Sequence, residues 1–343
     1  MTTPEALPEE RTTVTATAPE WLRDAVARAT LAPSSRNTQP WRFHVEGETV
    51  ELLADRTRQL PVVDPEDREL VIGCGAALLY LRLAIRNAGR RDVVEPFPDP
   101  ARPDLLARVR VGAAYFPTRE EEALFHAMPR RHSHRRPFDA RPVGAAMLAS
   151  LGAAAFVEGA MLDVTHGAAE RDALGTLVSA GDRRQAHDPA FRREFAAWLR
   201  ANDAPAHDGM PCAAFGIGDV ASCFTAFVVR RFDWGARQGA KDQALAAHAP
   251  ALALVSTDDD TPASWLRAGQ AVARVLLRAT AAGLVASFLN QPIEDPSLRA
   301  AVAESFGVST VPQLLLRLGY PVPVDEGAEE NVAARRAVDE VLV

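Results

Sequence analysis

Hydrophobic and polar positions follow two patterns along the chain, one typical of helices and one typical of strands. Residues 21–31 (WLRDAVARATL) carry apolar residues on one helical face, whereas residues 42–55 (RFHVEGETVELLAD) alternate like two strands joined by a turn. Residues 75–89 and 269–283 have apolar residues spaced for long, mostly buried helices. The pattern therefore predicts a fold that combines helices with sheets.

The two long predicted helices belong to a longer repeat. Each segment begins and ends with glycine and is followed by an acidic proline turn and then by an apolar strand that ends in glycine. The helices are 75–89 and 269–283, the turns are 98–100 (PDP) and 294–296 (EDP), and the strands are 105–112 (LLARVRVG) and 313–319 (QLLLRLG). Matches in the same order indicate an internal duplication.

We therefore expect two α+β halves, residues 1–125 and 126–343, packed on each other through the long helices as an intramolecular pseudo-dimer. Each half should be an α/β sandwich, a small mixed or antiparallel sheet flanked by helices. The second half is longer because it carries an insertion, residues 182–247, without a counterpart in the first. The insertion should begin as one amphipathic helix and continue through a long loop at 202–219, and loops of that length are uncommon unless functional.

The composition narrows the function class. Hydrophobic residues make up 48% of the 343 residues, enough for substantial cores, and the formal net charge of −7 argues against a nucleic-acid surface. The three cysteines form no CxxC pair, so neither a disulfide framework nor a zinc site is indicated. No apolar run is long enough for a membrane span, and the start of the chain lacks signal-peptide character. We expect a cytoplasmic protein without a metal.

Two polar motifs lie in different halves. The first half alone has PSSRNTQPW (33–41), and the second alone opens with the basic run RRHSHRRPF (130–138). Each has an ordinary interpretation, as a turn and as a solvated basic surface. Guanidinium groups also pair with phosphate bidentately, so the run is a candidate anion site. Each half thus lacks the motif that the other half has. This is expected if a dimer with two equivalent sites was fused into one chain and only one site was kept.

These motifs resemble the signatures of a known family. PSSRNTQPWRF (33–43), RRHSHRRPF (130–138), GLVASFLNQ (283–291) and GVSTVPQLLLRLGYP (307–321) are similar to those of the flavin-dependent nitroreductase superfamily. The likeness covers most of the chain and leaves out the insertion. A duplication with one surviving set of signatures resembles the Acg-like subgroup, in which one chain mimics the usual dimer. The resemblance implies one FMN per chain, bound noncovalently between the halves.

The resemblance also implies cofactor-binding residues. The residues of the basic run are expected to hold the FMN phosphate and ribityl chain and to reach the pyrimidine edge of the flavin. They are Arg131, His132, Ser133 and Arg135. Those of the polar loop cover the dimethylbenzene and ribityl side: Pro33, Ser34, Ser35 and Asn37. Gln39 and Trp41 brace this loop. The segment that passes a backbone amide to flavin N5 consists of Ser287, Phe288, Leu289, Asn290 and Gln291, with Asn290 the first candidate. Arg335 supplies a further phosphate contact, with Arg336 as its alternative, although Ala333 and Ala337 replace a frequent basic residue and a proline.

The implied activity is that of an FMN-dependent oxidoreductase, which passes electrons from NAD(P)H to a small acceptor such as a nitroaromatic or a quinone. No catalytic side chain is implied, because the flavin carries the chemistry and water can supply protons. The alternative is an FMN storage protein in which the insertion acts as a lid.

Three further expectations concern packing. Met210, Cys212, Phe215 and Ile217, within 203–222, either pack near the flavin's open face or dock elsewhere on the second half. The C-terminal DEVLV (339–343) is expected to be a strand that extends the first half's sheet. The chain is expected to be a monomer or a dimer of such chains, binding neither nucleic acid nor membrane.

Overall fold

The computed structural model describes residues 19–165, 167–215, 219–231, 235–323 and 333–343. Its helices are α1 (Glu20–Ala29), α2 (Arg68–Asn87), α3 (Arg119–Ala127), α4 (Ala145–Val157), α5 (Ala168–His187), α6 (Pro189–Ala197), α7 (Asp219–Arg231), α8 (Gly235–Ala247), α9 (Pro262–Ala281), α10 (Pro296–Phe306) and α11 (Val338–Val341). Its strands are β1 (Trp41–Glu46), β2 (Thr49–Ala54), β3 (Arg90–Pro96), β4 (Leu105–Ala114), β5 (Met161–Val164), β6 (Leu199–Arg200), β7 (Met210–Pro211), β8 (Ala251–Thr257), β9 (Val285–Phe288) and β10 (Val311–Gly319).

The first half contains a four-stranded sheet in the order β1-β2-β4-β3, antiparallel throughout. Trp41 and Phe43 of β1 are fully buried, whereas the alternate residues Arg42 and His44 are exposed to solvent. This is the alternation that the sequence predicts. Gly47 makes the tight turn to β2 with a φ of 55°. The predicted strand, turn and strand over 42–55 are confirmed.

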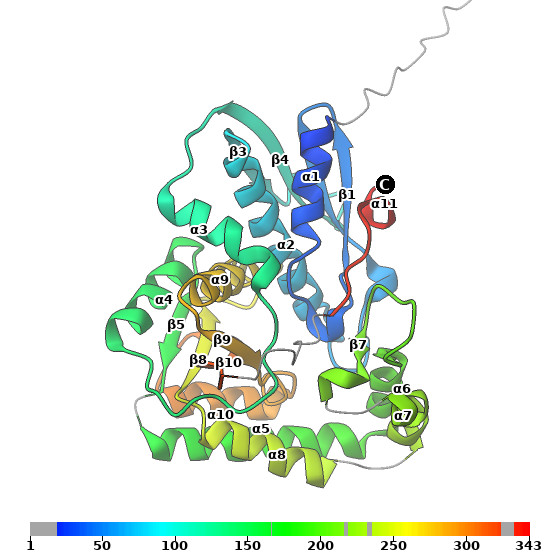
Figure 1. Cartoon of the computed structure of the whole chain (residues 1–343), viewed down its shortest axis with the longest axis vertical. Coiled ribbons are helices and arrows are strands. Elements are labelled where there is room, and N and C mark those ends of the chain that lie inside the picture. Colours follow the sequence, from blue (N-terminus) through cyan, green and yellow to red (C-terminus); the bar gives the residue numbers. More distant parts are fainter. Residues whose placement is uncertain (1–18, 166, 216–218, 232–234, 324–332) are drawn as a thin grey trace, which may run out of the picture.

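The second half repeats this layout. Its four-stranded sheet has the order β5-β8-β10-β9 and is also antiparallel throughout. β8 is buried along its whole length and β10 nearly so, because helices cover both faces of the sheet. The chain therefore has the α+β fold with two sheet-and-helix halves that the duplication predicts (Figure 1). The expected boundary at 125/126 falls within α3, which lies against both α2 and α9, and its placement stays a prediction.

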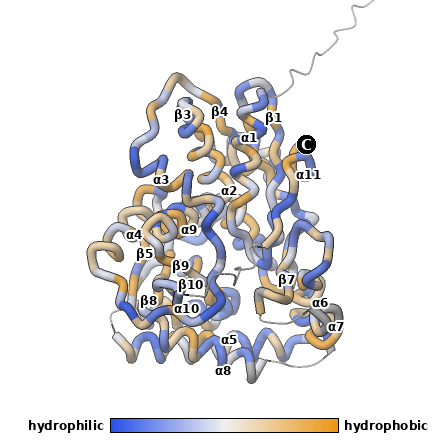
Figure 2. Tube along the Cα trace, viewed as in Figure 1, coloured by the Kyte–Doolittle hydropathy of each residue, from blue (hydrophilic) through white to orange (hydrophobic). Residues whose placement is uncertain are grey.

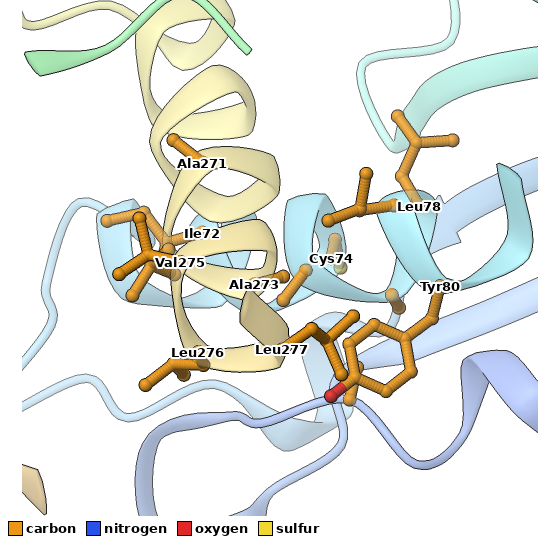
Figure 3. Packing of buried hydrophobic residues seen from close by; sticks show 14 of the residues in the cluster. Ile72, Cys74, Leu78, Tyr80, Ala271, Ala273, Val275, Leu276 and Leu277 are labelled. Atoms are coloured by element: carbon orange, nitrogen blue, oxygen red, sulfur yellow. The ribbon is translucent and has the colours of Figure 1, made fainter. Parts of the chain in front are cut away.

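The long helices α2 and α9 cross at the centre of the molecule and join the halves (Figure 3). Ile72 and Leu78 of α2 and Ala271 and Val275 of α9 belong to one hydrophobic cluster, which extends to both sheets. A core that runs through both halves favours a single cooperative unit over two separately folding domains.

The insertion is more helical than the sequence predicts. The single amphipathic helix expected at its start is wrong: α5 ends at His187, and α6 begins at Pro189, capped by Asp188, whose side chain accepts a hydrogen bond from Ala190 N. The long loop expected at 202–219 contains β7 and a 3₁₀ turn, Cys212–Phe215, and α7 and α8 follow. α8 packs along α5, and both alternate between hydrophilic and hydrophobic positions (Figure 2).

Most of DEVLV is helical rather than a strand, so that part of the expectation is wrong, but Leu342 pairs with Phe43 of the first sheet in a single parallel bridge, as the expected crossover requires. Asp339 and Glu340 occupy the first turn of α11, where negative charge favours a helix. The segment nevertheless reaches the first sheet, because Val343 N donates to Phe43 O at 3.0 Å (Figure 1). Within the described ranges, no helix is long and apolar enough to cross a membrane.

Candidate active site

A cavity of about 980 Å³ lies where the two halves and the insertion meet. Every cofactor-binding residue that the resemblance implies lines it: Pro33, Ser34, Ser35, Asn37, Arg131, His132, Ser133, Arg135, Ser287, Phe288, Leu289, Asn290, Gln291 and Arg335. The volume falls within the range of about 300–1,000 Å³ typical of ligand pockets. The structure thus brings together residues from four separate segments at one place.

Two arginines, the buried Arg131 and the half-buried Arg335, lie near one another at the cavity wall. Arg131 donates to Leu31 O, and Arg335 donates to Asn37 Oδ1 at 2.9 Å and to nearby backbone carbonyls, so among the described residues both meet neutral oxygens. The Nε of each is buried and has no hydrogen-bond partner there. Burial and the neighbouring charge of Arg131 lower the pKa of Arg335 to about 9. Two neighbouring guanidinium groups without a carboxylate partner among their hydrogen bonds to described residues favour the binding of an anion, and of phosphate in particular.

The polar loop before β1 has an unusual backbone. Arg36, Asn37 and Gln39 have positive φ angles of 50–55°, a region that asparagine tolerates better than most residues. Asn37 Nδ2 donates to Gly209 O and to Ala334 O, both at 3.0 Å, while its Oδ1 accepts from Arg335. Asn37 therefore ties the loop to both the insertion and the C-terminal segment. The side-chain amide of Asn37 thus makes these structural hydrogen bonds, and Asn37 also lines the cavity.

Gln39 and Trp41 lie beneath the loop. Gln39 is fully buried, donates from Nε2 to His207 O at 2.8 Å, and accepts from Arg336 N at 2.9 Å. Trp41 is fully buried in the core. Arg336 is held by these contacts and by Asp55 and does not line the cavity, whereas Arg335 does.

The basic run packs against the second sheet. Ser133 forms an isolated parallel bridge with Ala286, and His134 N donates to Ala286 O at 2.8 Å. The Arg317 guanidinium supports the run from below by donating to His134 O at 2.8 Å. Arg135 is turned inward, where burial lowers its pKa, and its guanidinium lies 5.0 Å from the ring centre of Phe215. Within the run, only the flanking Arg130 and Arg136 are solvent-exposed arginines.

A group of polar side chains joins the loop to the segment after β9. Ser35 Oγ donates to Glu69, which also accepts from Arg68 and, at 3.4 Å, from Asn290 Nδ2. Asn290 Oδ1 accepts from Leu315 N at 3.1 Å, so both ends of its amide are fixed. Burial and the nearby charge of Glu69 raise the pKa of Glu294 to about 8.

The insertion forms one wall of the cavity and is fastened to the first half. We call three interactions the latch contacts: Arg36 with Glu194 at 2.7 Å, Val62 N with Glu194 at 2.7 Å, and Arg58 with Asp208. Gly209 N also donates to Asn37 O at 3.2 Å. Both partners of the Arg36–Glu194 pair are largely buried, so solvent screens the pair less than a surface ion pair.

The apolar residues of the insertion divide between the cavity and a small core. Met210 and Phe215 line the cavity, whereas Cys212 is buried behind it, in a cluster with Leu199. Ile217 lies outside the described residues. Two of these side chains therefore lie at the cavity, and their packing near the flavin's open face stays a prediction.

Sequence reasoning missed several polar groups at the cavity: Glu69, Asp182, Asp242, Glu294 and Arg317. Glu69, Asp182 and Asp242 come from helices, Arg317 from β10 and Glu294 from the turn between β9 and α10. The available signal for Asp182 and Asp242 was the small-residue face of the helices that carry them, because Gly235 and Gly239 are one turn apart and allow α8 to approach α5 closely. No described group of three or more His, Cys, Asp and Glu side chains could hold a metal ion.

Comparison with known proteins agrees with this site. The nitroreductase family matches residues 128–320, and a second family, described as "Putative TM nitroreductase", matches residues 6–64. "Putative NAD(P)H nitroreductase Rv3131" from Mycobacterium tuberculosis is 32% identical over 308 residues, which cover 89% of this chain and 87% of the relative. "Putative NAD(P)H nitroreductase acg" from the same organism is 30% identical over 322 residues, 94% of this chain and 95% of the relative.

A solved structure is similar at lower identity. The FMN- and NADPH-dependent nitroreductase NfnB from "sphigopyxis sp. strain HMH" has a TM-score of 0.42 and 20% identity, over 64% of this chain and 96% of that one. The family match covers more than half of this chain, and the Mycobacterium relatives extend over nearly all of it. The chain therefore belongs to the nitroreductase family of oxidoreductases and is Acg-like within it.

Proposed function

We propose that the chain binds one FMN in the cavity between its halves and uses it to transfer electrons from NAD(P)H to a small acceptor, such as a nitroaromatic or a quinone. The observation that carries this proposal is the neighbouring pair Arg131 and Arg335, whose buried Nε atoms have no partner among the described residues. A phosphate between them would satisfy both groups and offset their mutual repulsion. The names of the relatives add NAD(P)H as the electron donor.

The roles of the remaining residues follow from their places on the wall. Asn37 and Ser35 present short polar groups from the first half, and Arg135 presents a buried cation from the second. Positive charge at the pyrimidine edge would stabilise the negative charge that a flavin gains on reduction. We infer that a backbone N–H of Ser287–Gln291, a segment that lines the cavity, donates to the flavin; Leu289 is not the candidate, because its N–H donates to Leu315 O at 2.8 Å. When bound, FMN supplies the hydride chemistry, while the protein positions it and excludes water.

The acceptor is a small molecule, because the cavity of about 980 Å³ lies between both halves and the insertion. We further propose that the protein works in the cytoplasm, as a monomer or as a dimer of such chains. An anaerobic titration of the flavin-loaded protein with NADH and with NADPH tests the function. Bleaching of the flavin absorbance by either nucleotide, followed by recovery on adding a quinone, supports a reductase.

FMN storage is the second candidate function, and the latch contacts favour it. Arg36–Glu194 and Arg58–Asp208 hold the insertion against the loop that borders the cavity. If this arrangement persists in solution, a nicotinamide cannot approach the flavin until the insertion moves, because hydride transfer needs the reacting atoms about 3–3.5 Å apart. Slow flavin reduction in the titration, at full flavin occupancy, would identify the storage protein.

A further inference from the structure

Two buried carboxyl groups, Asp182 and Asp242, lie together on the cavity wall formed by the insertion. Asp182 comes from α5 and is 3% exposed, and Asp242 comes from α8 and is 9% exposed. The side-chain amide of Gln291 bridges them, with Nε2 donating to Asp182 Oδ1 at 3.2 Å and to Asp242 Oδ2 at 3.1 Å. We call these two residues the carboxyl pair.

Close backbone packing fixes the carboxyl pair in place. A Cβ at Gly181 would lie 2.8 Å from the backbone of Gln291, and one at Gly239 would lie 2.9 Å from Ser179 Oγ. Only glycine permits these approaches, which bring α5 onto the segment after β9 and onto α8. Figure 1 shows α5 and α8 running side by side. The site is thus built into the packing of three elements rather than into a mobile surface.

The hydrogen bonds of the pair are incomplete unless it carries a proton. Asp182 Oδ2 is buried and receives no N–H or O–H from the described residues. A proton on one carboxyl, shared with the other, satisfies that oxygen and removes the repulsion between two buried negative charges. Burial and the charge of Asp242 raise the pKa of Asp182, and burial raises that of Asp242.

Several cations surround the pair and affect its charge. Lys241 on α8, Arg183 on α5 and Arg317 on β10 act electrostatically on one or both carboxyls, and Arg135 interacts with Asp242. Gln238 donates to Asp242 Oδ2 at 2.9 Å. These groups would stabilise the second negative charge that remains after the pair gives up its proton.

We propose that the Asp182–Asp242 pair donates its shared proton to the molecule that is reduced in this cavity. The proposal rests on the proposed function. A quinone or nitro group that takes two electrons needs protons as well: one travels with the electrons as hydride from the reduced flavin, and the second must come from an acid. Here the O–H bond of the pair breaks and an O–H bond forms on the acceptor. The quinone becomes the quinol, or the nitro group becomes nitroso and water, and solvent then returns a proton to the pair.

Glu294 is the other carboxyl at the cavity with a raised pKa. It accepts from Gln185 and faces the charge of Glu69, so loss of its proton would place two negative charges near one another. Arg36 and Arg68 act electrostatically on Glu294 as well, so nearby cations do not distinguish the two candidates. The pair differs because two carboxyls can share one proton, and a Glu294→Gln variant separates the two.

Reoxidation of the chemically reduced flavin protein tests the proposal without any nicotinamide step. Asp182→Asn and Asp242→Asn should slow reoxidation by a quinone on the order of 100-fold, the usual size of a lost acid. Reoxidation by ferricyanide, which takes an electron and no proton, should stay within about twofold of the unmodified protein. Asp188→Asn is the matched control, because Asp188 is exposed in the same insertion and asparagine can replace its helix cap.

Two results would overturn the proposal: quinone reoxidation that is unchanged in both variants, or an equal slowing with ferricyanide. A slowing seen in Glu294→Gln and absent from the aspartate variants would assign the proton to Glu294 instead. In the unmodified protein, quinone reoxidation should slow as the pH rises through the raised pKa of the pair, whereas ferricyanide reoxidation should not.

Infrared spectroscopy gives a readout that needs no turnover. The unmodified protein should show the C=O band of a protonated carboxylic acid at pH 7, shifted in D₂O and reduced in Asp182→Asn. Ordinary aspartates, with a pKa of about 3.9, are fully ionised there. Absence of a band that depends on Asp182 contradicts the shared proton even if the chain proves to hold no flavin. A chain that shows the band and fails to accept electrons from NAD(P)H would contradict the proposed function alone.

Discussion

Gly75 of α2 and Gly269 of α9 face each other where the two helices cross. A Cβ at Gly269 would lie 2.0 Å from Ile72 O, and a Cβ at Gly75 would lie 2.3 Å from Leu266 O. The two backbones are therefore in direct contact, with apolar side chains packed around the crossing (Figure 3). This contact sets the distance between the halves, and hence the width of the cavity that they enclose.

Gly269→Ala should destabilise the protein. The added methyl group has no space, and overpacking of this kind costs about 1–3 kcal/mol. Gly152→Ala is the control, because it lies in α4 and its new methyl would be 4.0 Å from the nearest atom, Leu162 O. That variant should be neutral or slightly more stable, since alanine favours helices. Urea unfolding measures both, and equal free energies of unfolding would refute the close crossing.

Glu158 joins the halves by a buried ion pair network. It accepts from Arg82 of α2 at 2.6 Å and from Arg274 of α9 at 2.8 Å. Glu158→Gln should cost about 3–5 kcal/mol, because it leaves the buried Arg274 without its compensating charge, whereas Arg82 keeps its ion pair with Asp92. The free energy of unfolding at pH 7 measures this. A loss below about 1 kcal/mol, the value of a surface pair, would contradict the network.

The same residue predicts a pH dependence. Burial raises the pKa of Glu158, but Arg82 and Arg274 outweigh it and lower the pKa below its ordinary value of 4.5. A carboxyl with a lowered folded-state pKa stabilises the fold above its unfolded-state pKa, and this stability is lost as the pH falls through the folded-state pKa. Between pH 5 and 3 the unmodified protein should therefore lose more stability than Glu158→Gln. Parallel curves would show that Glu158 titrates normally.

The fold was predictable where a periodic pattern was strong. The alternation around Trp41 and Phe43 predicts β1, and the long apolar helices at 75–89 and 269–283 correspond to α2 and α9. The insertion was less predictable, because α7 and α8 carry mixed faces that only their packing on neighbouring elements explains. DEVLV has the β-branched residues of a strand, but its acidic first turn makes the short helix α11.

The site was predictable only through local motifs. Arg131 and Ser35 belong to short runs whose resemblance implies a role, and the structure brings both to one cavity. Asp182 and Asp242 lie on different helices and meet only because α5 and α8 pack closely at glycines. The glycines of α8 signal a close helix approach in the sequence but single out neither aspartate, so the pairing of Asp182 with Asp242 is a result of tertiary structure.

Arg131→Ala should weaken FMN binding far more than Arg130→Ala. Arg131 is buried at the cavity, whereas its neighbour Arg130 is exposed and does not line the cavity. Loss of a charge-assisted contact costs about 1.5–3 kcal/mol, which corresponds to a 10- to 150-fold rise in Kd. Fluorescence titration of flavin-free protein with FMN measures both variants. Equal affinities would refute the proposed phosphate site.

Glu194→Ala should loosen the insertion by removing two latch contacts at once, those with Arg36 and Val62 N. If the insertion gates the cavity, flavin reduction by NAD(P)H should become faster at similar flavin occupancy. Arg193→Ala, at the adjacent exposed position of α6, should leave the rate unchanged. Stopped-flow absorbance measures the rates. Rapid reduction in the unmodified protein that Glu194→Ala does not alter would exclude a gate and leave an ordinary reductase.

The flavin content of the purified chain tests the central claim most directly. Acid or heat releases noncovalently bound flavin, which can be identified and quantified against protein. The cavity shared by both halves predicts FMN at one per chain, with occupancy lost together with Arg131 or Arg335. Two FMN per chain, FAD in place of FMN, or no flavin after reconstitution with excess FMN would contradict a fused pseudo-dimer that keeps one flavin site.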